Sequence, residues 1–120
     1  TKASGRYLMI GTTTNLFAGI PKYSNDELFT TLLQHPQCRI ERIVSYGQCS
    51  PEGFWYDQTW DEWILLIQGS AELDVEGQLL PLCTGDHLLI AAGQKHRVTR
   101  TDLNQPTVWL AIHFNEPTKS

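Results

Sequence analysis

From position 38 to the C-terminus, the chain consists of short runs of apolar and β-branched residues separated by Gly, Pro, Asn and Asp. Runs of this length, bounded by turn-forming residues, predict β-strands that follow one another without intervening helices. The expected strands are residues 39–46, 54–57, 63–67, 71–75, 78–82, 87–90, 96–101 and 107–114. A meander of this kind favours an all-β fold, a compact barrel or sandwich.

Three glycines lie where these strands must turn. Gly69, Gly77 and Gly85 recur eight residues apart. Glycine adopts a positive φ without steric cost, as tight turns between strands require. The repeat therefore predicts successive hairpins.

The first 36 residues have a different pattern. Residues 1–19 are rich in Thr, Gly and Ser and lack a sustained period, so we expect an arm with one short strand at residues 7–10. Ser24 and Glu27 have the spacing of a capping box, and the apolar residues that follow have helical spacing. These signals predict a short helix over residues 25–34. We expect the helix to stop before His35-Pro36, since the residue before proline disfavours the helical region.

Strand periodicity assigns side chains to faces. In the run that begins at Glu62, alternate residues through Leu66 share one side, and the other side is also apolar. The outer face therefore needs a cover, which the arm or helix can supply. An exposed remainder would favour a homodimer.

Composition and charge narrow the possible functions. The 120 residues fit one domain, with an arm and helix over residues 1–36 packing on a β-barrel over residues 37–116. The formal net charge is −4, and the nine Lys and Arg are spread along the chain, which argues against nucleic acid as a partner. Apolar stretches run about six to eight residues, too short to span a membrane.

The three cysteines lack CxxC spacing and are odd in number. They indicate reduced thiols in a cytoplasmic protein rather than a disulfide framework. We expect Cys38 and Cys83 to be small buried residues.

Two metal-competent side chains stand on neighbouring predicted strands. Glu62 begins one strand and His96 begins another. If both point inward, the barrel holds a pocket with a carboxylate and an imidazole. In the last strand, His113 shares a face with Trp109 and Ala111, so strand parity can also direct it into the pocket.

The spacing of these residues resembles the cupin superfamily of small β-barrel proteins. The motif Gly-x5-Pro-x-Gly-x2-His is matched by Gly85, Gly93 and His96, with Ala91 in place of Pro. The motif Glu-x6-Gly is matched at Glu62. The resemblance implies a jelly-roll β-barrel whose interior binds a metal ion or a small organic molecule. The run over residues 50–58 also looks like a similar run that precedes the Glu in an uncharacterised subgroup of single-domain cupins.

The chain departs from the family's pattern at the expected histidine pair. This pair falls on Tyr56 and Gln58, or on Trp55 and Asp57, and neither register holds a histidine. By the resemblance, only Glu62 and His96 carry over as metal ligands.

Other residues can complete a divalent metal site for Zn, Mn, Fe or Ni. Gln58 can ligate through its carbonyl oxygen, and His113 can supply a second imidazole. The alternatives are a core histidine hydrogen-bonded to a neighbour at position 113, and a buried acid–imidazole pair without metal at positions 62 and 96.

The pocket supports two classes of function. With a metal, Lewis-acid chemistry on a small carboxylate- or sugar-like molecule would suit an isomerase, a lyase or a dioxygenase. Without one, Glu62 and His96 can serve as general acid and base, with Tyr56 as a further proton carrier. The rival is a non-catalytic module that binds or senses a small molecule. In either case we place Trp55 and Asp57 near the ligand, and an inward-pointing Arg42 would favour a carboxylate.

Overall fold

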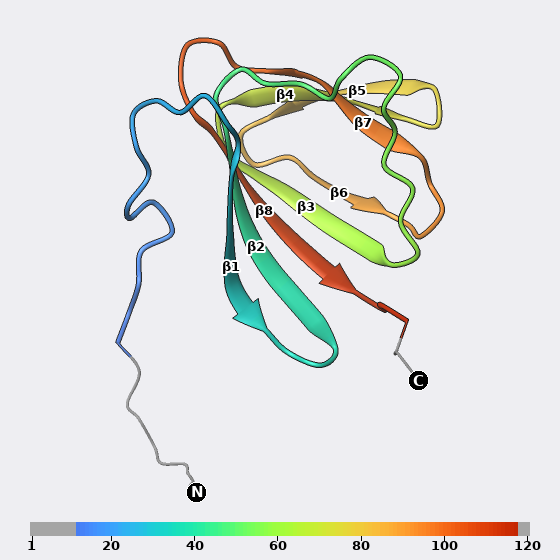
Figure 1. The fold of residues 1–120 in the computed structure, drawn as a ribbon, viewed down its shortest axis with the longest axis horizontal. Helices are drawn as coiled ribbons and strands as arrows, with labels where there is room; N and C mark the ends of the chain where they lie inside the picture. Colours follow the sequence, from blue (N-terminus) through green and yellow to red (C-terminus); the bar gives the residue numbers. More distant parts are fainter. Residues whose placement is uncertain (1–11, 118–120) are drawn as a thin grey trace, which may run out of the picture.

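The computed structural model describes residues 12–117, and the regular structure in that part of the chain consists of β-strands (Figure 1). The expected all-β fold is confirmed. The strands run in this order: β1 (Leu28–Gln34), β2 (Cys38–Ser45), β3 (Asp61–Gln68), β4 (Ser70–Val75), β5 (Gln78–Cys83), β6 (His87–Ile90), β7 (His96–Thr101) and β8 (Thr107–Phe114). The short strand expected at residues 7–10 lies outside the described residues.

The strands form two antiparallel sheets that face each other as a two-layered barrel (Figure 1). One sheet has five strands in the order β1-β2-β8-β3-β6, and the other has three in the order β5-β4-β7. The long strands β2 and β8 pair without interruption from Cys38↔Phe114 to Ser45↔Thr107. On the other side of β8, Glu62 of β3 is paired with His113.

An apolar core fills the space between the sheets. Its buried members come from five strands and are Ile64, Leu66, Ala71, Leu73, Leu82, Ile90, Trp109 and Ala111. Burying each large side chain contributes about 1.5–3 kcal/mol, so this cluster holds the two sheets together. The same inward faces also carry buried polar side chains, among them Glu62, His96 and His113.

The three regularly spaced glycines turn the chain, but only one of them closes a hairpin. Gly77 has a φ of 88° and joins the paired strands β4 and β5. Gly69 and Gly85 also have positive φ, yet each lies where the chain crosses from one sheet to the other. At Gly69 a Cβ atom would lie 2.6 Å from Oγ1 of Thr107, so this crossing also needs the absence of a side chain.

The helix expected over residues 25–34 is wrong, because most of that range is the edge strand β1. The register between β1 and β2 shifts between Thr31 and Leu33. A bulge of this kind breaks the period of two, so the apolar residues of the strand mimic helical spacing. Ser24 accepts a hydrogen bond from the backbone N–H of Asp26 in a local turn, while Glu27 accepts one from Ser45.

The segment at residues 46–60 crosses the barrel between β2 and β3 with little regular structure. The strand expected at residues 54–57 is wrong. Only Tyr56 pairs there, in an isolated bridge with His96 of β7. This bridge lays the segment against one end of the barrel.

The N-terminal segment is held to the outside of the five-stranded sheet by Arg42. The guanidinium of Arg42 donates hydrogen bonds to the carbonyl oxygens of Leu16 and Ala18, at 2.8 and 2.9 Å. The described residues contain no helix with the length and apolar character needed to cross a bilayer.

The three cysteine thiols are free, in line with the expectation of reduced cysteines. The expectation of burial is wrong for Cys83, which is exposed, whereas Cys38 is partly buried. Cys83 is the last residue of the edge strand β5, where its neighbour Leu82 takes the inward position.

Candidate functional site

A cavity of about 200 Å³ lies between the two sheets, beneath the segment at residues 46–60. Apolar side chains from both sheets form most of its wall, among them Ile64, Leu73 and Trp109. The polar side chains of Glu62, His96 and other residues project into this apolar chamber. Sites with few polar groups in an apolar pocket are typical of small-molecule binding.

Glu62 and His96 face each other across the cavity, as the strand parity predicted. Glu62 is 8% exposed and His96 is 6% exposed. The distance from Nε2 of His96 to Oε1 of Glu62 is 3.8 Å, which is too long for a hydrogen bond. A carboxylate and an imidazole therefore share one buried space without a direct bond between them.

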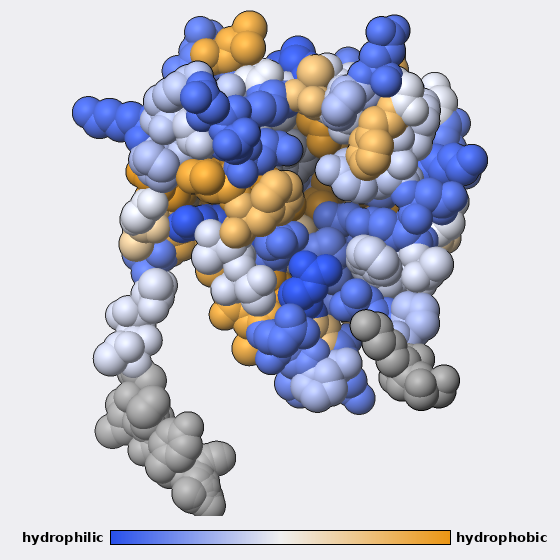
Figure 2. Space-filling view, in the orientation of Figure 1, coloured by the Kyte–Doolittle hydropathy of each residue, from blue (hydrophilic) through white to orange (hydrophobic). Residues whose placement is uncertain are grey.

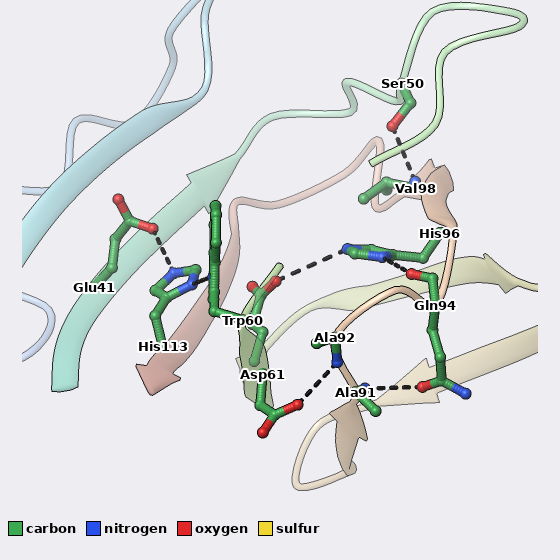
Figure 3. A network of polar contacts seen from close by, with 11 residues as sticks. Glu41, Ser50, Trp60, Asp61, Ala91, Ala92, Gln94, His96, Val98 and His113 are labelled. Atoms are coloured by element: carbon green, nitrogen blue, oxygen red, sulfur yellow. Dashed lines mark hydrogen bonds and ion pairs between the residues drawn. The ribbon is translucent and has the colours of Figure 1, made fainter. Parts of the chain in front are cut away.

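The hydrogen-bond partner of His96 fixes one of its ring protons. Nδ1 of His96 lies 3.0 Å from the carbonyl oxygen of Gln94 (Figure 3). Because a carbonyl only accepts, Nδ1 carries a proton, and in the neutral ring the lone pair on Nε2 faces Glu62. This arrangement also fits a metal-ligating histidine, whose second ring nitrogen usually donates to a carbonyl or carboxylate.

Gln58 supplies a third acceptor. Its Oε1 atom is buried and has no hydrogen-bond partner, and the residue lines the same cavity as Glu62 and His96. The backbone carbonyl of Gln58 is anchored by the N–H of Gly93, at 2.8 Å. The side chain is thus held at the cavity with an unsatisfied oxygen.

His113 lines the cavity, but both of its ring nitrogens are already used (Figure 3). The indole N–H of Trp60 donates to Nδ1 at 2.9 Å, so the ring proton of neutral His113 sits on Nε2. Nε2 lies 3.2 Å from Oε1 of Glu41. This matches the alternative of a core histidine bonded to its neighbours, and as a metal ligand His113 would have to give up one of these bonds.

Tyr56 covers the cavity beside His96. The two rings stack with centroids 5.3 Å apart at an angle of 21°. Burial raises the pKa of the Tyr56 hydroxyl, and the negative charges of Glu27, Glu62 and Glu41 raise it further. The phenol is therefore neutral at physiological pH and can donate a proton or a hydrogen bond, but it is not a ready base.

Three residues expected in the pocket do not line it. Arg42 points to the opposite face of β2 from its neighbours Glu41 and Ile43, toward the N-terminal segment. The segment at residues 46–60 turns Asp57 and Trp55 outward, and Trp55 instead lies under the guanidinium of Arg97 at 5.8 Å. The pocket that the described residues form is therefore without the expected arginine.

The amino-acid sequence also matches a known family. A model of the cupin domain matches residues 44–113 of the chain. The chain belongs to the cupin family. The match spans the strands from the end of β2 to β8, and so includes Glu62, His96 and His113.

Several solved structures are similar to this cupin. A proposed mannose-6-phosphate isomerase from Ralstonia eutropha is 45% identical, with a TM-score of 0.84 over 87% of this chain and 98% of that one. A cupin superfamily protein from Desulfitobacterium hafniense is 21% identical, with a TM-score of 0.67 over 79% and 83% of the two chains. A conserved Streptococcus pyogenes protein of unknown function is 16% identical, with a TM-score of 0.71 over 93% of each chain. No curated protein matches the chain.

Two carboxylates of the cavity wall were not foreseen from the sequence. Glu41 alternates with Ile43 on the inward face of β2, so the period of two carried a signal for it. Glu27 precedes β1 and accepts a hydrogen bond from Oγ of Ser45 at 2.7 Å. Its place in the wall depends on that tertiary contact, whereas its spacing from Ser24 suggested a helix cap.

The cavity of this cupin offers few atoms that could ligate a divalent metal ion. The described residues contain no group of three or more His, Cys, Asp and Glu side chains placed to hold a metal. With the orphaned Oε1 of Gln58, the centre of the cavity offers the carboxylate of Glu62, the imidazole of His96 and one amide oxygen, because Glu27, Glu41 and His113 are engaged in hydrogen bonds with other side chains. Such a set is acceptable in ligand type, since imidazole and oxygen ligands suit first-row metals, but it lacks the family's further histidines.

Proposed function

We propose that this cupin binds a small polar molecule inside the barrel, and that donor groups of this molecule satisfy Glu62, His96 and Gln58. One observation carries the proposal: Oε1 of Gln58 is a buried acceptor without a partner, at a cavity where the carboxylate of Glu62 and the imidazole of His96 lie 3.8 Å apart with no direct hydrogen bond. A buried acceptor without a partner costs about 1–3 kcal/mol, and more when it is charged. A ligand that brings donors to these atoms recovers that free energy as affinity.

The same residues can move protons on a bound molecule. Nε2 of neutral His96 is free to act as a base, and the neutral hydroxyl of Tyr56 beside it can act as a proton donor. The relative from Ralstonia eutropha, a proposed isomerase, supports isomerisation as the first reaction class to test. Binding without turnover, as in a sensing module, uses the same contacts.

A metal-assisted enzyme is the second candidate, favoured by the orphaned oxygen of Gln58 and by the carbonyl behind His96. Glu62, His96 and Gln58 would hold the ion, which could be Zn, Mn, Fe or Ni. When bound, it would polarise a substrate oxygen as a Lewis acid, which suits an isomerase, a lyase or a dioxygenase. Tyr56 would then orient the substrate by hydrogen bonding.

We also propose a homodimer in the cytoplasm. Apolar residues of the edge strand are well exposed, with Phe29 at 56%, Leu32 at 45% and Leu33 at 47%. Figure 2 shows apolar surface on the lower part of the molecule, where Figure 1 places β1. The free cysteines fit a reducing compartment. Light scattering across a range of protein concentrations tests the dimer.

The decisive experiment identifies what occupies the cavity. Protein purified without chelator is analysed for metals by elemental analysis and for bound small molecules by native mass spectrometry followed by denaturation. We expect a co-purifying molecule that is lost from Glu62→Gln and His96→Asn but kept by Arg42→Met, whose side chain points away from the cavity. A metal near one equivalent that the first two variants lose would select the second candidate. If wild-type protein carries neither, and a metabolite library produces no thermal shift, the proposed function is wrong.

A further inference from the structure

The wall of the cavity has an unbalanced charge. Among the described residues that line it are three carboxylates, Glu27, Glu41 and Glu62, and neither a lysine nor an arginine. Two arginines, Arg42 and Arg97, stand on strands that form the cavity wall, and the strand arrangement keeps both out of the cavity.

Strand alternation turns Arg42 and Arg97 outward, whereas Arg39 shares the inward face of β2 with Glu41 and pairs with it. In β2, Arg42 lies between the inward Glu41 and Ile43, and in β7, Arg97 lies between the inward His96 and Val98. Each guanidinium is then taken up by backbone carbonyls elsewhere. Arg42 binds the N-terminal segment, and Arg97 donates to the carbonyl oxygens of Ser50 and Pro51 at 3.0 and 3.2 Å.

The three carboxylates differ in how far the protein neutralises them. Glu41 lies 3.6 Å from the guanidinium of Arg39 and accepts a hydrogen bond from His113. Glu27 has the hydroxyl of Ser45, which is uncharged. Glu62, nine-tenths buried, lies 3.8 Å from Nε2 of His96 without a hydrogen bond to it. Two of the three charges are therefore left to an occupant of the cavity.

The three carboxylates share the cavity with an aromatic wall. The aromatic side chains of Phe29, Tyr56 and Trp109 line the same space, and aromatic faces attract cations.

The polar centre also matches a particular donor group. A primary ammonium has three N–H donors and no acceptor. Glu62, Nε2 of neutral His96 and Oε1 of Gln58 offer three acceptor groups. A hydroxyl has one donor, and a phosphate or carboxylate brings further negative charge without the Arg or Lys that usually receives it.

We propose that the molecule bound in this cavity is a small organic cation, with an ammonium group against Glu62, His96 and Gln58 and an apolar body against the aromatic wall. This inference rests on the proposed small-molecule function and names its ligand class. The inferred ligand differs from mannose 6-phosphate, the substrate in the name of the Ralstonia eutropha relative, since the phosphate of such a sugar would meet an acidic wall.

A matched series of probes tests the charge preference directly. Binding of n-butylamine, n-butanol, butyrate and mannose 6-phosphate is measured on chelator-treated protein by titration calorimetry and chemical-shift changes. We expect n-butylamine to bind at least about tenfold more tightly than n-butanol, with no binding of the two anions. The preference should fall with added salt, as expected for charge attraction.

Two different carboxylates are substituted, so that the test still gives an answer if one of the variants fails to fold. Glu62→Gln should reduce the ratio of amine to alcohol affinity at least about tenfold, and Glu27→Gln, nearer the surface, should reduce it less. Arg100→Met, an exposed change away from the cavity, should leave the ratio unchanged.

The outcomes distinguish this inference from the proposed function. If n-butanol or an anion binds as well as the amine, the cation preference is wrong while the small-molecule function stands. If no probe binds and wild-type protein carries no small molecule, both fail. An amine preference that survives Glu62→Gln and Glu27→Gln unchanged would overturn the assignment to this cavity.

Discussion

Trp60 holds His113 in a single tautomer, because its indole N–H donates to Nδ1 at 2.9 Å. The proton is thereby kept on Nε2, which faces Glu41 at 3.2 Å. His113, which strand periodicity suggested as a second imidazole ligand, is thus hydrogen-bonded on both ring nitrogens within the wall of the barrel.

The first prediction removes that indole donor. Trp60→Phe leaves Nδ1 of a buried histidine without its partner, so we expect a loss of about 1–2 kcal/mol in the free energy of unfolding. Urea denaturation measures the loss, and nitrogen chemical shifts of His113 report a mixture of tautomers. Trp63→Phe is the matched control, since Trp63 packs on His87 and does not bond His113. Equal effects of the two changes would contradict the role of the bond.

The second prediction concerns the buried carboxylate of Glu62 in the ligand-free protein. Glu62→Gln removes a buried carboxylate that His96 does not hydrogen-bond, so ligand-free protein should gain about 1 kcal/mol of stability. Thermal denaturation after extensive dialysis measures the change, with Glu52→Gln at an exposed position as the control. A variant that binds no ligand yet unfolds more easily than wild type would show that Glu62 has a structural partner.

The third prediction compares two glycines with similar backbone angles. Gly77→Ala meets open space and should cost about 1–2 kcal/mol for its left-handed conformation. Gly69→Ala has the same backbone cost and also places its Cβ 2.9 Å from Cα of Thr107, so we expect at least twice the loss. Chemical denaturation of both variants gives the comparison. Equal losses would mean that the sheet crossing at Gly69 can relax.

The fourth prediction follows from Asp61. A hydrogen bond from Asn115, and next the N–H of Ala92, lower the pKa of this carboxyl below its usual value. A lowered pKa stabilises the folded protein above the unfolded pKa of about 4, and this contribution is lost as the pH falls through the folded pKa.

Melting temperatures from neutral to acidic pH test this dependence. Asp61→Asn should lie below wild type at neutral pH and approach it in acid, because the variant has no proton to take up. Asn115→Ala, which removes the largest cause of the shift, should lose part of the same dependence. Parallel curves for wild type and Asp61→Asn would refute the linkage.

The fold was most predictable where the period of two is undisturbed. The alternations through Glu62 and Leu66 in β3, and through Trp109 and His113 in β8, gave both the strands and their inward faces. In β1 the bulge after Thr31 breaks the alternation, so the local pattern suggested a helix. Pairing with β2 decides the conformation there, and no local signal records that pairing.

The candidate site was predictable in its centre and less so in its wall. Glu62, His96, Gln58, Tyr56 and His113 were expected near one another, and the structure brings all five to the cavity. Their functional roles stay predictions.

The sequence-based predictions of the cavity wall failed for residues whose position depends on tertiary contacts. Parity alone places Glu41 and Arg42 on opposite faces of β2, and the pairing of Glu41 with Ala111 of the core decides that Glu41 points inward. The lining role of Glu27 depends on its bond to Ser45, far along the chain.

The crossing segment at residues 46–60 supplies Cys49, Ser50, Pro51, Tyr56 and Gln58 to the cavity, while the sheets and Glu27 supply the rest. Five lining residues of the cavity are therefore encoded in one uninterrupted stretch of sequence that contributes no residue to the buried core cluster. Exchanging that stretch between homologues should change which ligand bodies fit the cavity, while the preference for charge that Glu62 and Glu27 impose from outside the stretch should stay with the scaffold.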